Sequence, residues 1–96
     1  MDRQTTLDLL AEHKTHLGRV FGVRSLALFG STVRGTASTE SDVDVLVSFD
    51  GPATSTRYFG VKFYLEDLLG RTVDLVTDKA VRTELRATIE REAVHV

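Results

Sequence analysis

The chain contains no cysteine. Disulfide bonds, thiolate metal sites and nucleophilic cysteine chemistry are therefore excluded. No apolar run approaches the roughly 20 residues that a membrane-spanning helix requires, and the first residues do not form a basic and then apolar signal peptide. From these absences we expect a cytoplasmic protein that does not enter a membrane.

An excess of basic residues is also missing, since the formal net charge is -2. Broad nucleic-acid binding depends on clustered Lys and Arg, so no direct nucleic-acid partner is expected. Acidic residues instead gather around Glu40, Asp42, Asp44 and Asp50. Such a cluster repels phosphate groups unless cations lie between them, so the charge distribution itself indicates a metal ion.

The length of 96 residues predicts one small domain over residues 1–96. Apolar spacing predicts helices over residues 7–21, 57–69 and 81–92, and strands over residues 23–29, 42–49 and 72–77. The first strand is apolar almost throughout, which favours burial on both faces. The second helix has a wide apolar surface, which is typical of a deep core helix or of a helix that faces a partner. These elements predict an α/β (α+β) domain.

The most informative feature is a Gly-Ser pair followed at a fixed distance by paired carboxylates. Gly30-Ser31 comes directly after the first predicted strand, and Asp42-Val43-Asp44 begins the second. Gly30 allows the backbone to approach a phosphate closely. The Ser31 hydroxyl and nearby backbone N–H groups can donate to phosphate oxygens, and Arg34 offers a fork of donors for bidentate phosphate contact. We therefore predict a phosphate-binding turn at Gly30, Ser31 and Arg34.

The carboxylates fit a metal site on one face of the sheet. Residues two apart in a strand point to the same face, so Asp42 and Asp44 project together. If the third strand is the neighbour of the second, Asp74 joins them. Three carboxylates with open positions suit Mg²⁺, and two such ions stabilise both the attacking and the leaving oxygen of an in-line displacement at phosphorus. Asp42, Asp44 and Asp74 are thus the predicted metal ligands and catalytic residues of a nucleotidyl transferase.

Each of these residues also has a purely structural interpretation. Asp42 and Asp44 could mark a strand start with solvent-facing carboxylates, although Asp is disfavoured in strands. Gly30-Ser31 could be only a turn, and Asp74 could be an edge charge that discourages aggregation. The combination of all of them at this spacing, with strands on both sides, favours the catalytic interpretation.

These motifs resemble the nucleotidyltransferase domain of the DNA polymerase beta superfamily, in which Gly-Ser, Arg-Gly, Asp-x-Asp and a later strand Asp occur in this order. The nearest resemblance is to the MNT-type minimal nucleotidyltransferases, the antitoxin partners of HEPN ribonuclease toxins. The stretch 68–77, Leu-Leu-Gly-Arg-Thr-Val-Asp-Leu-Val-Thr, is also typical of that group. The resemblance covers residues 7–96 and implies a mixed β-sheet with helices packed mainly on one side.

The resemblance also implies an activity. ATP would be the donor, Mg²⁺ the cofactor, with two ions, and AMP would be transferred to a tyrosine hydroxyl of the cognate HEPN toxin, which neutralises it. Asp42 and Asp44 would hold the metals, and Asp74 would complete the metal site or accept the proton of the acceptor hydroxyl. The β- and γ-phosphates would be held by Gly30, Ser31 and Arg34.

Two other functions stay open beside this protein adenylyltransferase. The chain could be a non-catalytic antitoxin that blocks the toxin by covering it, an idea motivated by the aromatic residues Phe59, Phe63 and Tyr64 of the second helix. It could also transfer a nucleotide to a small molecule. So short a chain has little room for a separate substrate-binding domain, which favours a protein acceptor that brings its own recognition surface. The helix over residues 58–69 and the last helix are the candidate docking surfaces.

Overall fold

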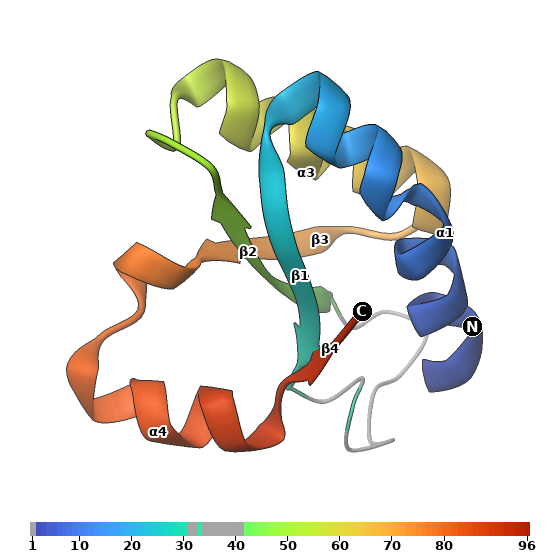
Figure 1. Cartoon of the computed structure of the whole chain (residues 1–96). Coiled ribbons are helices and arrows are strands. Elements are labelled where there is room, and N and C mark those ends of the chain that lie inside the picture. Colours follow the sequence, from blue (N-terminus) through green and yellow to red (C-terminus); the bar gives the residue numbers. More distant parts are fainter. Residues whose placement is uncertain (1, 31–32, 34–41) are drawn as a thin grey trace.

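The computed structural model of the chain describes residues 2–30, 33 and 42–96. Two helices, α1 and α3, lie side by side on one side of a β-sheet, and a third helix, α4, lies on the other side (Figure 1). The elements are α1 Arg3–Phe21, β1 Val23–Phe29, β2 Val43–Phe49, α3 Ser55–Leu69, β3 Val73–Thr77, the 3-10 turn η1 Asp78–Ala80, α4 Thr83–Glu92 and β4 Val94–His95. The predicted helices and strands are confirmed in type and order, and β4 is an addition.

The sheet has the strand order β3-β2-β1-β4. β1 pairs antiparallel with both β2 and β4, whereas β2 pairs parallel with β3. A parallel pair needs a crossover connection, and α3 supplies it. The sheet is therefore mixed, with two helices packed on one face, as the sequence resemblance implied.

Strand periodicity assigns the two faces of the sheet. In β2, Val43, Val45 and Val47 are fully buried, while the residues between them are half-buried. The buried residues face α1 and α3, where they join Leu10 and Leu65 in the hydrophobic core. The alternate residues lie on the opposite face, which we call the open face. In β1 the expected burial on both faces holds only for the stretch 26–28.

Several predicted helix boundaries are wrong by a few residues, because short polar side chains cap the helices earlier than expected. α1 begins at Arg3 because the Asp2 carboxylate accepts a hydrogen bond from the Thr5 N–H, which is typical of an N-cap. Thr54 caps α3 in the same way. By contrast, α4 begins two residues later than predicted, at Thr83, because Asp78–Ala80 forms a separate 3-10 turn before it.

The two aromatic pairs of α3 differ in environment. Tyr58 and Tyr64 are half-buried, and the Tyr64 hydroxyl lies 2.6 Å from Nδ1 of His13 on α1. Phe59 and Phe63 are exposed, at 47% and 57%, and their rings stack with centroids 5.9 Å apart. Thus α3 is a core helix on one side, as one interpretation of its wide apolar surface expected, and presents two aromatic rings to solvent on another. The interpretation that α3 faces a partner stays a prediction.

Side chains of α3 protect the outer edge of β3. The Thr72 carbonyl accepts from the Val43 N–H, so by strand alternation the backbone polar groups of Val73 and Leu75 point outward. The Val73 N–H donates to Glu66 at 2.9 Å, and the Tyr58 hydroxyl donates to the Leu75 carbonyl at 2.6 Å. An edge strand with paired backbone groups offers no template for another strand.

Two hydrogen bonds hold the pKa of the Glu66 carboxyl below its ordinary value of 4.5. The larger effect comes from the Val73 N–H and the smaller one from Lys62. A carboxyl whose pKa is lowered in the folded state stabilises the fold at every pH above its pKa in the unfolded chain. This contribution to the free energy of unfolding disappears as the pH falls through the pKa of the folded state. We expect Glu66→Gln to lower the urea midpoint at pH 7 and to have little effect once the pH is below the folded-state pKa of Glu66. Urea titrations of both proteins between pH 3 and pH 7 measure this.

Glu12→Gln, at an exposed position on α1, is the control and should match the parent protein at every pH. A midpoint difference for Glu66→Gln that is the same at pH 3 and pH 7 would show that the charge of Glu66 does not stabilise β3.

The carboxyl-terminal tail packs on the core. Val94 and Val96 pack against the core cluster, the Val96 N–H donates to the Leu26 carbonyl, and Lys14 of α1 donates to the Val96 carbonyl at 2.9 Å. Within residues 2–30, 33 and 42–96, no helix is long and apolar enough to span a membrane.

Candidate functional site

The end of β1 lies directly beside a carboxylate of β2. Phe29 pairs with Asp44 across the two strands, and the chain then turns at Gly30 with φ +74°. A Cβ atom on Gly30 would collide with the Asp44 carboxylate. Glycine is therefore required at this position both by its backbone conformation and by the close approach of Asp44.

The three predicted catalytic carboxylates lie at one end of the sheet, and two of them lie on the open face. Asp44 and Asp74 are direct partners in the parallel register of β2 and β3, so their side chains project from the same face. Asp42 comes directly before β2, one residue outside the strand, so its place on this face stays a prediction. Asp42 and Asp74 are exposed, and Asp44 is half-buried. We call Asp42, Asp44 and Asp74 the acidic row.

The acidic row does not by itself form a closed metal site. Among the residues that the structure describes, no group of three or more His, Cys, Asp or Glu side chains is arranged to hold a metal ion. Carboxylate oxygens on an accessible face are nevertheless the ligands that Mg²⁺ prefers, and Mg²⁺ is usually bound by one or two carboxylates together with substrate phosphates. The donor set thus fits Mg²⁺ that arrives with a phosphorylated substrate.

The predicted phosphate-binding turn is only partly described. Gly30 lies against Asp44 as stated above, which brings one predicted phosphate-binding residue next to one predicted metal ligand. Ser31 and Arg34 lie outside the described residues, so their roles stay predictions.

The open face beside the acidic row is apolar, which the sequence interpretation missed. Phe29 is half-buried next to Asp44, and Leu46 pairs with Val76 in the following row of the sheet. These residues were predicted only as parts of buried strands. The signal that could have found them is the register, because a residue two positions from Asp44 must share its face.

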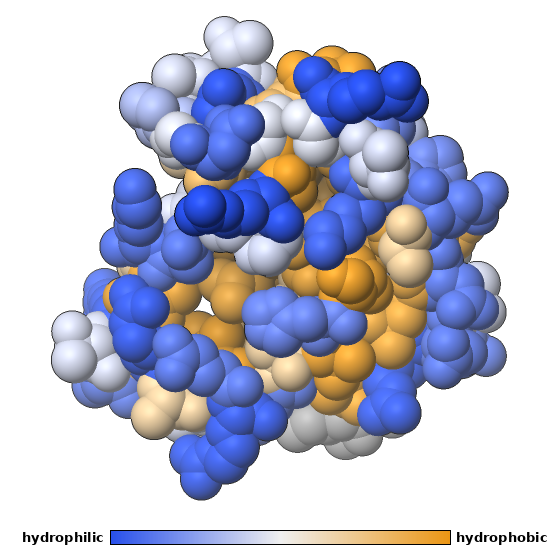
Figure 2. All heavy atoms as spheres, in the orientation of Figure 1, coloured by the Kyte–Doolittle hydropathy of each residue, from blue (hydrophilic) through white to orange (hydrophobic). Residues whose placement is uncertain are grey.

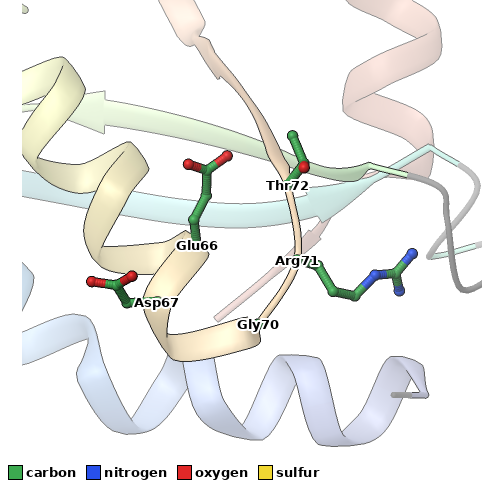
Figure 3. A pocket seen from close by; sticks show the side chains of 5 residues that line it. All are labelled: Glu66, Asp67, Gly70, Arg71 and Thr72. Atoms are coloured by element: carbon green, nitrogen blue, oxygen red, sulfur yellow. The ribbon is translucent and has the colours of Figure 1, made fainter.

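A polar hollow of about 360 Å³ borders the other side of the acidic row. Figure 3 shows its lining at the turn from α3 to β3, where the Arg71 side chain extends away from Glu66 and Asp67. Thr72 also lines this hollow. The Thr72 carbonyl accepts a hydrogen bond from the Val43 N–H, so this part of the lining lies next to the start of β2. Arg71 therefore adds a positive charge near this end of the sheet, which the position of an Arg just before the Asp74 strand could have signalled.

Comparison with known protein families gives one match that covers most of the chain. Residues 10–96 match the model of the nucleotidyltransferase domain. The sequence is 42% identical over 88 residues to the protein adenylyltransferase MntA of Thermococcus cleftensis, which covers 92% of this chain and 89% of the relative.

Two solved structures are similar in fold. One is described as a candidate minimal nucleotidyltransferase; it has a TM-score of 0.82, 36% sequence identity, and a match that covers 98% of this chain and 95% of that chain. The other is a chain of the complex between a tri-AMPylated HEPN toxin of Shewanella oneidensis and an MNT antitoxin. Its TM-score is 0.69 at 17% identity, with 97% of this chain and 70% of that chain covered, so it supports the fold alone.

Proposed function

The chain belongs to the nucleotidyltransferase domain family, and from this premise we propose that it is a Mg²⁺-dependent protein adenylyltransferase of a toxin–antitoxin pair. It transfers AMP from ATP to a tyrosine hydroxyl of a HEPN-type toxin. The observation that carries the proposal is the acidic row beside the Gly30 turn. Support for the acceptor comes from the relative named as a protein adenylyltransferase and from the similar fold in a complex with an AMPylated HEPN toxin.

In the proposed reaction the tyrosine oxygen attacks the α-phosphorus of ATP. The new bond is P–O to tyrosine, the bond to the bridging oxygen of the β-phosphate breaks, and pyrophosphate leaves with the electron pair. Mg²⁺, when held by Asp42 and Asp44, would supply positive charge against the phosphates and the leaving oxygen. Such electrostatic stabilisation, together with positioning, supplies most of the catalysis in phosphoryl-type transfers.

Each site residue has a defined task in this proposal. Asp42 and Asp44 hold the metal ions, and Asp74 completes the metal site or accepts the tyrosine proton. Because Gly30 has no side chain, the turn can lie close to both Asp44 and the triphosphate. Ser31 and Arg34 donate to the β- and γ-phosphates.

The proposal predicts a mass change in the partner. We expect the HEPN-type protein encoded beside this chain to gain one or more AMP units when it is incubated with this protein, ATP and Mg²⁺. Because the proposed transfer depends on Mg²⁺, chelation with EDTA should stop the transfer and excess Mg²⁺ should restore it. Intact-mass spectrometry of the partner measures both effects.

A specific observation favours one other function. Phe59 and Phe63 form an exposed stacked pair on α3, and exposed aromatic residues are typical of binding surfaces. The chain would then neutralise the toxin by binding alone. A stable complex without any mass gain would support this function and contradict the adenylyltransferase. Nucleotide transfer to a small molecule in the absence of any protein partner would instead indicate the third, small-molecule function.

A further inference from the structure

A second apolar surface lies outside the hydrophobic core. On the open face, the residues Phe29, Leu46 and Val76 are half-buried and do not belong to the core cluster or to the residues packed against it. They lie next to the acidic row, since Phe29 pairs with Asp44 and Leu46 is two residues beyond it. Their apolar atoms are thus left accessible beside the proposed catalytic residues.

Helix α4 faces this surface without burying any residue of its own. Ile89 is half-buried, which identifies the side of α4 that is turned toward the rest of the molecule. Leu85 lies on the same side, because residues four apart are neighbours on a helix, and yet it is 50% exposed. The helix predicted to begin at residue 81 begins at Thr83 instead, and Val81 precedes it in extended conformation.

The path of the chain holds α4 across the open face. α4 follows β3 through η1 and ends at Glu92, next to β4, where Val94 pairs with Leu28. At its beginning, Arg86 donates to the Asp78 carbonyl at 3.0 Å, which fixes the helix to η1. Figure 2 shows a hollow between α4 and the sheet, with hydrophobic side chains on its wall.

We propose that the apolar surface of Phe29, Leu46 and Val76 on the open face, together with the side of α4 that carries Leu85 and Ile89, is the docking site for an apolar segment of the acceptor protein next to its target tyrosine. The inference rests on the proposed function. The tyrosine oxygen has to reach a phosphate held at the acidic row, so the residues on either side of the tyrosine must cross the adjoining surface. That surface is apolar and accessible, as an interface core requires.

The surroundings of this surface agree with a protein occupant. On α4 the sequence neighbours of Leu85 and Ile89 include charged residues of both signs, namely Glu84, Arg86 and Glu90. An apolar centre with a polar rim is the usual anatomy of a protein–protein interface. The acceptor segment therefore presents aliphatic or aromatic side chains toward Leu85 and Ile89.

The test replaces Leu85 with Asp. We expect Leu85→Asp to weaken the complex with the HEPN-type partner at least about tenfold, the size typical of losing an interface anchor. KM for the partner should rise in the transfer reaction, while KM for ATP stays unchanged. Titration of the partner by calorimetry and steady-state AMP transfer measure these quantities, and thermal unfolding checks that the variant is folded.

Val20→Asp is the matched control, because Val20 is 55% exposed on α1, in the opposite layer of the fold. It should bind and transfer like the parent protein. Unchanged partner affinity of Leu85→Asp, or an effect on KM for ATP alone, would overturn the docking site. If the parent protein binds the partner without transferring AMP while Leu85→Asp still weakens binding, the docking site holds and the proposed function fails.

Discussion

Replacing both Asp42 and Asp44 with Asn should abolish AMP transfer while the protein remains folded. Asn keeps the shape and an acceptor oxygen of Asp but removes the negative charge, and a site for Mg²⁺ depends on that charge. We expect the rate of transfer to fall at least about 10³-fold, as for the loss of a major electrostatic contribution to a transition state.

The fold should tolerate this double replacement because Asn matches the size and shape of Asp. Asp42 is exposed and Asp44 is half-buried, and Asp44 is directly paired with another carboxylate, Asp74, in the register of β2 and β3. Like charges in directly opposite positions destabilise a sheet, so the replacement removes one repulsive pair. We therefore expect the variant to unfold in a single transition, like the parent protein.

Intact-mass spectrometry of the partner and thermal unfolding of the variant measure the two effects separately. The control is Asp8→Asn with Glu12→Gln, which removes the same charge from exposed positions of α1 and should not change the transfer. Wild-type transfer by the Asp42/Asp44 variant would refute the metal site. Full protection against the toxin by a variant without transfer would support neutralisation by binding.

The positions of the carboxylates could be predicted from the sequence because strand periodicity is local. The strand predicted from residue 42 begins at Val43, so Asp44 lies on the open face as predicted, and the shared face of Asp42 and Asp44 stays a prediction. The pairing of Asp74 with Asp44 was predicted on the condition that β3 is the neighbour of β2, and the register confirms that condition. The functional roles of these residues stay proposals.

Other features could not be predicted because they depend on contacts between distant segments. β4 has only the two residues Val94 and His95, too few for a periodic pattern, and it exists because Leu28 and Ala27 of β1 offer a free edge. The exposure of Leu85 depends on where η1 directs α4. Ser31 and Arg34 lie outside the described residues, so the phosphate-binding half of the site still rests on the motif.

Replacing Gly30 with Ala should have the second largest effect on transfer. Gly30 adopts a left-handed backbone conformation at φ +74°, which is about 1–2 kcal/mol less favourable for a residue with a Cβ. The new Cβ would also collide with the Asp44 carboxylate, so this side chain must leave its place beside the turn. Misplacing a catalytic group by about 1 Å can reduce the rate about 10²-fold, and we expect a loss of at least that size.

Gly70 provides a control that separates the two costs. It has nearly the same backbone conformation, φ +66°, and no heavy atom of the described residues lies within 4 Å of the position that its Cβ would take. Gly70→Ala should therefore lose about 1–2 kcal/mol of stability from the backbone alone and keep its transfer rate. Gly30→Ala should lose at least as much stability and, in addition, its activity, as measured by urea unfolding and by AMP transfer. If Gly30→Ala instead transfers AMP as fast as Gly70→Ala, the position of Asp44 beside the turn does not matter for catalysis, and the carboxylate would be a structural residue of the sheet.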